Sequence, residues 1–194
     1  MKKRKNSFED FYLSYVKNLN SILLNINKQD IKKATNLIIK KIKNNKSIYI
    51  CGNGGSAAIS NHYICDYLKL IRTFTKFKPK IYSLSNNIET VTAIANDISY
   101  DEIFKYQAES YCNKDDLLII ISSSGNSKNI IKLLNFAKRK KIQTIGFCGF
   151  KGGYLKKNSS IPVHVNINNY GMSEDSHHIL MHSIMQYIIK IFKK

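Results

Sequence analysis

The sequence predicts an α/β fold built on a parallel, doubly wound sheet. Short apolar runs typical of buried strands alternate with segments whose apolar residues recur every three or four positions, as on one face of a helix. Two of the turns that lead from a strand into a helix are rich in glycine or serine, at residues 52–56 and 122–127. Because ligands bind at the carboxyl ends of the strands in such a sheet, we expect both turns to lie at the functional site.

Two amphipathic helices come first. Apolar residues form one stripe from Phe8 to Leu23 and a second from Ile31 to Ile42, and a break at Asn27 separates the two. Nothing polar in these stripes suggests chemistry, so we expect residues 1–45 to serve in packing or oligomerisation. Residues 46–194 are expected to form the α/β core, and residues 1–194 together a single domain that buries a substantial core.

The elements of the core can be placed in order along the chain. Strands are expected at residues 47–51, 80–84, 117–121, 142–147 and 161–165. Helices are expected after an N-cap at Ser56, at 88–95, at 103–111, around 130–137, and after an N-cap at Ser173. Asn96 and Asp97 are expected to interrupt the helical pattern. The unbroken apolar run at 117–121 is the clearest strand, because it is typical of a sheet covered on both faces.

The composition is strongly basic, with a formal net charge of +18. Lysine and arginine bind phosphate groups, so such a charge would suggest a nucleic acid or an anionic membrane as the partner. The lysines are nevertheless scattered along the helices, and the dense clusters at 2–5 and 138–141 are short and lack interleaved aromatic residues. We therefore interpret the charge as solvated helix faces, and expect neither nucleic acid nor membrane as a partner.

The cysteines and the first residues indicate a cytoplasmic protein. Cys51, Cys65, Cys112 and Cys148 form no C-x-x-C pair, which argues against a disulfide framework or a zinc knuckle and favours a reducing compartment. The basic start of the chain is followed by the sequence Phe-Glu-Asp-Phe rather than by an apolar signal segment. No apolar run approaches the length of a membrane span.

The glycine-rich turn has the features of an anion site. It includes Asn53, Gly54, Gly55 and Ser56, and it joins a buried strand to the start of a helix. Glycines allow backbone N–H groups to approach a ligand closely, and a helix N-terminus favours negative charge, so a phosphate is the expected guest. On the same helix, His62 and Asp66 lie four residues apart and therefore share one face.

The serine-rich turn repeats this arrangement. Hydroxyl groups converge on one turn before a helix, from Ser122, Ser123, Ser124 and Ser127. Together they can surround a phosphate with neutral donors. A simple turn and helix cap would need only one of them, so we favour the binding interpretation.

The last helix carries a second group of chemically active side chains. Glu174, His178 and His182 follow one another at four-residue spacing, which places them along one face. Taken singly, Glu174 has a structural explanation as an acidic residue near a helix start, and His182 one as a core histidine. Four of the five histidines, however, lie on the two helices that we place beside the site. Imidazole and carboxylate groups from two helices can form a site for zinc or a similar divalent metal.

The motifs together resemble one family, the phosphoheptose isomerases of the sugar isomerase (SIS) domain superfamily. The resemblance rests on residues 51–58 with His62, on Ala95-Asn96-Asp97, on residues 121–127 and 149–153, and on His182. It implies a three-layer αβα sandwich with a five-stranded parallel, flavodoxin-like sheet, and a homotetramer. It also implies an isomerase that converts sedoheptulose 7-phosphate to a manno-heptose 7-phosphate, a precursor for polysaccharide synthesis.

The resemblance also implies roles for individual residues. Phosphate binding falls to Ser56, Ser122, Ser124 and Ser127, and contacts with the rest of the substrate to Asn53, Gly54, Gly55, Asp97, Ser123 and Glu174. Zinc ligation falls to His62, Asp66, Glu174 and His182, and acid/base catalysis to Asp66 and His182. This chain departs from the best-known members at two of these positions, with Asp66 where they have glutamate and Glu174 where they have glutamine.

Three other interpretations remain open at the level of the sequence. The chain is also compatible with a non-catalytic SIS-domain protein that binds a phosphosugar and regulates a partner. An isomerase of a different sugar phosphate is compatible with the changes at Asp66 and Glu174. A nucleotide-binding module is disfavoured, because the glycine turn lacks both the G-x-G-x-x-G spacing and the lysine of a P-loop.

Overall fold

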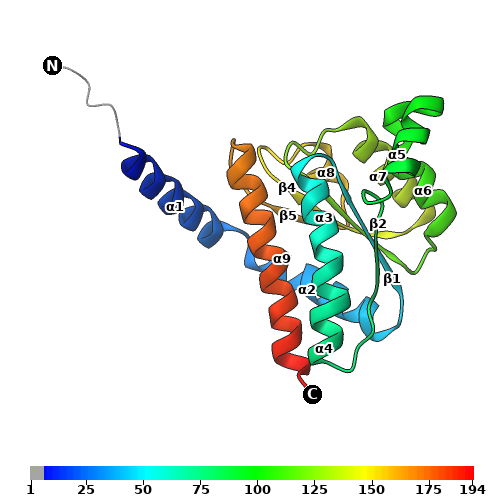
Figure 1. Ribbon diagram of the computed structural model, residues 1–194, viewed down its shortest axis with the longest axis horizontal. Coiled ribbons are helices and arrows are strands. Elements are labelled where there is room, and N and C mark those ends of the chain that lie inside the picture. Colours follow the sequence, from blue (N-terminus) through cyan, green and yellow to red (C-terminus); the bar gives the residue numbers. More distant parts are fainter. Residues whose placement is uncertain (1–6) are drawn as a thin grey trace.

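A five-stranded, all-parallel sheet forms the centre of the protein (Figure 1), whose computed structural model describes residues 7–194. The strands are β1 (Ser47–Gly52), β2 (Lys80–Ser83), β3 (Leu117–Ser122), β4 (Gln143–Cys148) and β5 (Ile161–His164), in the order β2-β1-β3-β4-β5. All five predicted strands are therefore confirmed. The order reverses between β1 and β3, which is where ligands bind in a doubly wound sheet.

The helices surround this sheet. They are α1 (Phe8–Asn25), α2 (Lys28–Lys43), α3 (Gly55–Cys65), α4 (Arg72–Phe74), α5 (Ile88–Ile94), α6 (Ile103–Tyr111), α7 (Lys128–Lys140), α8 (Gly153–Asn158) and α9 (Tyr170–Phe192). A π-helical segment, Asp66–Ile71, joins α3 to α4, and a second, Ala95–Ser99, continues α5. The backbone is extended at Ser99, with φ −179° and ψ 143°, and a 3₁₀ turn, Tyr100–Glu102, then leads into α6.

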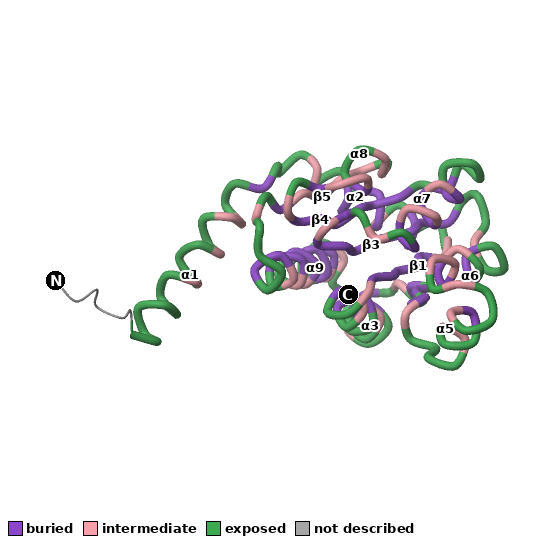
Figure 2. The backbone as a smooth tube through the Cα atoms, turned by 90° about the horizontal axis from the view of Figure 1, so that it is seen from above, coloured by how far each residue is buried: buried purple, intermediate pink, exposed green. Residues whose placement is uncertain are grey.

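Two hydrophobic cores, one on each face of the sheet, make the fold a three-layer sandwich. One core joins the sheet to α2, α3 and α9, and the other joins it to α6, α7 and α8. Every residue of β3 is buried, as its unbroken apolar run predicted (Figure 2). The fold class that the sequence predicts is therefore confirmed.

Three local predictions were wrong. Gly54, with φ 53°, precedes α3 in place of the expected cap Ser56, which is a buried residue of the helix. Asn169 caps α9 by accepting a hydrogen bond from the Met172 amide, so this helix begins before Ser173. The interruption expected at Asn96 and Asp97 lies at Ser99 instead, because the chain continues in π turns through Asp97 and becomes extended only at Ser99.

Helix α1 extends from the sandwich as an arm (Figure 1). None of its residues is buried, although it carries large exposed apolar side chains: Phe8, Phe11, Tyr12, Leu13, Val16 and Leu24. The Tyr15 hydroxyl donates a 2.7 Å hydrogen bond to Asp175 and so connects α1 to α9. Between residues 7 and 194, no helix is long and apolar enough to cross a membrane. The basic cluster at residues 2–5 lies outside the described part of the chain.

Candidate active site

The carboxylate of Glu174, a residue of α9, lies against the glycine turn at the start of α3. A Cβ on Gly52 would lie 2.7 Å from the backbone of Ser56, so only glycine allows the turn to close this tightly. A Cβ on Gly55 would lie 2.5 Å from the carboxyl carbon of Glu174, which shows that this α9 side chain packs against the first residue of α3. Burial, and secondly the charge of Asp175, raise the pKa of Glu174.

Asn53 connects the glycine turn to two other elements. Its side-chain amide and that of Asn129 donate to one another, at 3.0 and 2.9 Å. The Tyr100 hydroxyl donates to the same Asn53 oxygen at 3.0 Å. Asn129 and Tyr100 received no role from the sequence, because only the folded structure brings them to this turn. Asp97, on the segment before Tyr100, is exposed and accepts a 2.8 Å hydrogen bond from Asn96.

The serine turn lies beside the glycine turn, since β3 pairs with β1. Gly125 has φ 66°, and its amide donates to the Ser122 hydroxyl at 3.2 Å. The Ser124 hydroxyl accepts from the Asn126 amide at 3.3 Å, whereas the Ser127 hydroxyl makes no capping bond to α7. Ser123 is buried, and its hydroxyl has no hydrogen-bond partner within residues 7–194. These hydroxyls therefore remain as donors for a ligand.

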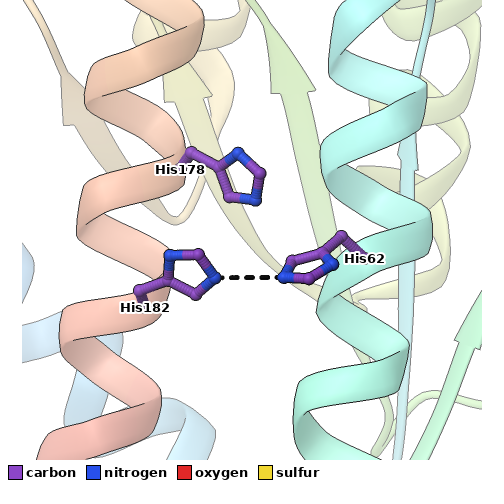
Figure 3. Close-up of side chains that lie close together, drawn as sticks. All are labelled: His62, His178 and His182. Carbon is purple, nitrogen blue, oxygen red and sulfur yellow. Dashed lines mark hydrogen bonds between the residues drawn. The ribbon is translucent and has the colours of Figure 1, made fainter.

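Helices α3 and α9 run side by side and bring three histidines together (Figure 3). His62 of α3 faces His178 and His182 of α9, and the Nε2 atoms of His62 and His182 are 3.1 Å apart. Asp66 is buried beside them. Its Oδ2 lies 3.2 Å from Nε2 of His182, and its Oδ1 lies 3.6 Å from Nε2 of His62.

These separations match those between the ligands of a metal ion. Bonds of about 2.0–2.1 Å to a tetrahedral zinc place two donor atoms roughly 3.3 Å apart. The two Nε2 atoms are 3.1 Å apart, and the two carboxylate oxygens of Asp66 lie 3.2 Å from His182 and 3.6 Å from His62. Nitrogen and carboxylate oxygen donors are also of the type that zinc binds. The residues present therefore fit a divalent metal.

The glycine and serine turns lie at the carboxyl ends of the paired strands β1 and β3, and the histidines lie further along α3 and α9. Three of the four expected metal ligands, His62, Asp66 and His182, are in contact with one another. Within the described residues, the ligand atoms that all lie within 4.8 Å of one another belong to His62, His178 and His182, and this group includes neither Asp66 nor Glu174. Burial, and secondly the neighbouring His182, lower the pKa of His178.

Comparison with known proteins identifies the family of the chain. Residues 11–149 match the model of the SIS domain family. The chain is 36% identical to a phosphoheptose isomerase of Aliarcobacter butzleri over 160 residues, which is 82% of this chain and 84% of that protein. It is 35% identical to a phosphoheptose isomerase of Helicobacter pylori over 162 residues, or 84% of each chain.

A solved structure agrees with the fold. A phosphoheptose isomerase from Francisella tularensis superposes with a TM-score of 0.83 over 95% of this chain and 96% of that one, at 24% sequence identity. The family match covers well over half of the chain, and the relatives exceed 30% identity over most of it. The chain therefore belongs to the SIS domain family and is an enzyme of the phosphoheptose isomerase family.

Proposed function

We propose that this protein interconverts sedoheptulose 7-phosphate and a manno-heptose 7-phosphate, or a closely related ketose and aldose phosphate, by proton transfer through an enediolate. The observation that carries the proposal is the cluster of Asp66, His182 and His62, which forms on the helix that begins at the glycine turn and on its neighbour α9. The names of the relatives support the same class of substrate.

The two turns are assigned to substrate binding. Ser56, Ser122, Ser124 and Ser127 hold the phosphate in this proposal, as hydroxyls beside the starts of α3 and α7. The phosphate then acts as a remote handle, whose binding energy positions the reacting carbons. The remaining contacts to the sugar come from Asn53, Gly54, Gly55, Asp97, Ser123 and Glu174. The free hydroxyl of Ser123 and the position of Glu174 against Gly55 support this assignment.

The proton transfers are assigned to Asp66 and His182. Isomerisation moves one proton between C1 and C2 and a second between the two oxygens, so two titratable groups are needed. Each such group contributes typically about 10²- to 10⁴-fold to the rate. His62, Asp66 and His182 would hold a divalent metal such as zinc, which would supply polarisation of the substrate carbonyl and stabilisation of the enediolate charge.

We also propose that the protein is a cytoplasmic homo-oligomer, most simply a tetramer. The exposed apolar side chains of α1 support this, because an isolated chain would leave Phe8, Phe11 and Leu13 in water. Light scattering during size-exclusion chromatography measures the assembly directly. A monomer at micromolar concentration contradicts this part of the proposal.

Hydrogen exchange into the substrate tests the enzymatic proposal. The metal-loaded protein is incubated in D₂O with a panel of ketose phosphates, and deuterium at C1 or C2 is followed by NMR. We expect exchange with at least one heptulose phosphate, and a loss of about 10²-fold or more in the His182→Ala variant. Ser183→Ala is the matched control, since this neighbouring exposed hydroxyl donates to Ile179 of its own helix and has no other hydrogen-bond partner among residues 7–194.

Two outcomes would contradict the proposal. Wild-type protein that exchanges no substrate of the panel is not an isomerase of these sugars, and a phosphosugar-binding role then explains the two turns. Full exchange by His182→Ala, with the Ser183→Ala control unchanged, removes His182 from the acid/base pair.

A further inference from the structure

We infer that His178 is a ligand of the metal, in the place that the resemblance gives to Glu174. The resemblance assigns His178 no role, and the proposed reaction uses it in no step. The inference rests on the proposed function only in that both require a metal at this site. It concerns which side chains of this particular chain hold the ion.

The position of the His178 ring supports the inference. Its ligand nitrogen lies within 4.8 Å of those of both His62 and His182. Figure 3 shows the ring in the space between α3 and α9, on the side of α9 that His182 also uses. The ring stacks on that of His182, with centroids 4.7 Å apart, and meets His62 edge-on at 5.1 Å. Two histidines at i and i+4 on one helix face are a known way to hold zinc.

The hydrogen bonding of His178 also supports the inference. Its Nε2 is buried, and it has no hydrogen-bond partner among residues 7–194. A buried polar atom without a partner costs free energy, so such atoms are rare unless they serve a ligand. A metal ion between the three rings would use this lone pair.

Glu174 is held elsewhere. Its carboxyl group packs against Gly55 at the start of α3, one helical turn before His178 on α9. A helix N-terminus stabilises a carboxylate there. Glu174 is therefore placed to contact a substrate at the glycine turn, whereas His178 is placed to contact the ion. Three imidazoles form a donor set that suits zinc or cobalt better than magnesium, and the Asp66 carboxylate lies beside two of them.

Metal titration of the full chain tests this inference without any measurement of activity. The protein is stripped of metal and titrated with Zn²⁺ by calorimetry, and with Co²⁺ by visible absorption, which reports the number and type of ligands. We expect His178→Gln and His178→Ala to weaken binding of both ions by at least about tenfold and to change the cobalt spectrum. Glu174→Gln and Ser183→Ala are expected to bind within about threefold of wild type, since losses of the order of tenfold mark residues that support a metal.

The outcomes separate this inference from the proposed function. Unchanged metal binding by both His178 variants, a loss confined to Glu174→Gln, or no metal binding by the wild type overturns the inference. Thermal unfolding of the metal-free variants shows whether each is folded. If one of the two His178 variants is unfolded, metal binding by the other tests the inference. Metal binding that depends on His178 in a protein without isomerase activity upholds the inference and contradicts the proposed function.

Discussion

Replacing Gly125 by alanine is expected to destabilise the protein and to displace the serine turn. Gly125 has φ 66°, a conformation that costs an alanine about 1–2 kcal/mol. The added Cβ would also overlap the carbonyl group of Gly152, whose carbon would lie only 2.8 Å away. Because this neighbour is backbone and cannot rotate aside, we add roughly 1–3 kcal/mol for overpacking. The total is roughly 2–5 kcal/mol, or a fall in the melting temperature of roughly 4–20 °C for a chain of this size.

Gly54→Ala is the matched control for this prediction. Gly54 also has a positive φ, 53°, but a Cβ there would meet nothing within 4 Å. Its substitution should therefore cost only the backbone strain, about 1–3 kcal/mol. Thermal and urea unfolding of both variants measure the difference. If Gly125→Ala loses less than about 2 kcal/mol, the lower end of the predicted range, the predicted clash with Gly152 does not exist.

Three smaller predictions follow from single contacts. Hydrogen bonds from Lys132 and a second lysine lower the pKa of Glu102, so this pairing stabilises the protein above about pH 5 and is lost as the pH falls. Urea unfolding between pH 3 and pH 7 should therefore show a smaller loss on acidification in Glu102→Gln than in wild type. Tyr15→Phe removes the bond to Asp175 and should lower the free energy of unfolding by about 0.5–1 kcal/mol, measured by thermal unfolding. Ser123→Ala removes a buried hydroxyl without a partner among the described residues, and should leave stability unchanged or raise it by up to about 1 kcal/mol while weakening phosphosugar binding by calorimetry.

Each of these predictions has a contrary outcome. Equal acid sensitivity of Glu102→Gln and wild type would mean that the lysine pairing contributes nothing to stability. Unchanged unfolding of Tyr15→Phe would show that the bond to α9 does not hold α1 in place. A marked loss of stability in Ser123→Ala would show that its hydroxyl has a structural partner.

The sequence was sufficient to predict the sheet and most of the helices. The five strands are short apolar runs between clear turns, and a parallel sheet covered on both faces requires that pattern. The start of α9 was misplaced because Ser173 and Asn169 are both good caps, and local preference does not distinguish them. Ser173 is instead buried within the helix, next to Gly149.

The candidate site was predictable only where it depends on helical spacing. Four-residue spacing on one helix predicts that His62 and Asp66 share a face, and the contact of both with His182 agrees with this. The contact of Glu174 with Gly55 depends on how α3 and α9 lie against each other, which spacing along one helix does not determine. The same holds for Tyr100, whose bond to Asn53 spans 47 positions of the chain.

The π-helical segment that begins at Asp66 makes the alignment of this region sensitive to the number of residues in the chain. A π turn contains more residues than an α turn, so it often marks a single-residue insertion in an ordinary helix. Loss of one residue between positions 67 and 71 would restore α geometry and leave the following side chains in their present orientation, because the π turn holds the extra residue. The same loss from an α-helical turn of α3 would rotate the following side chains by about 100° and turn the buried Ile71 away from its core. Comparisons between relatives should therefore consider helix length here as well as residue identity.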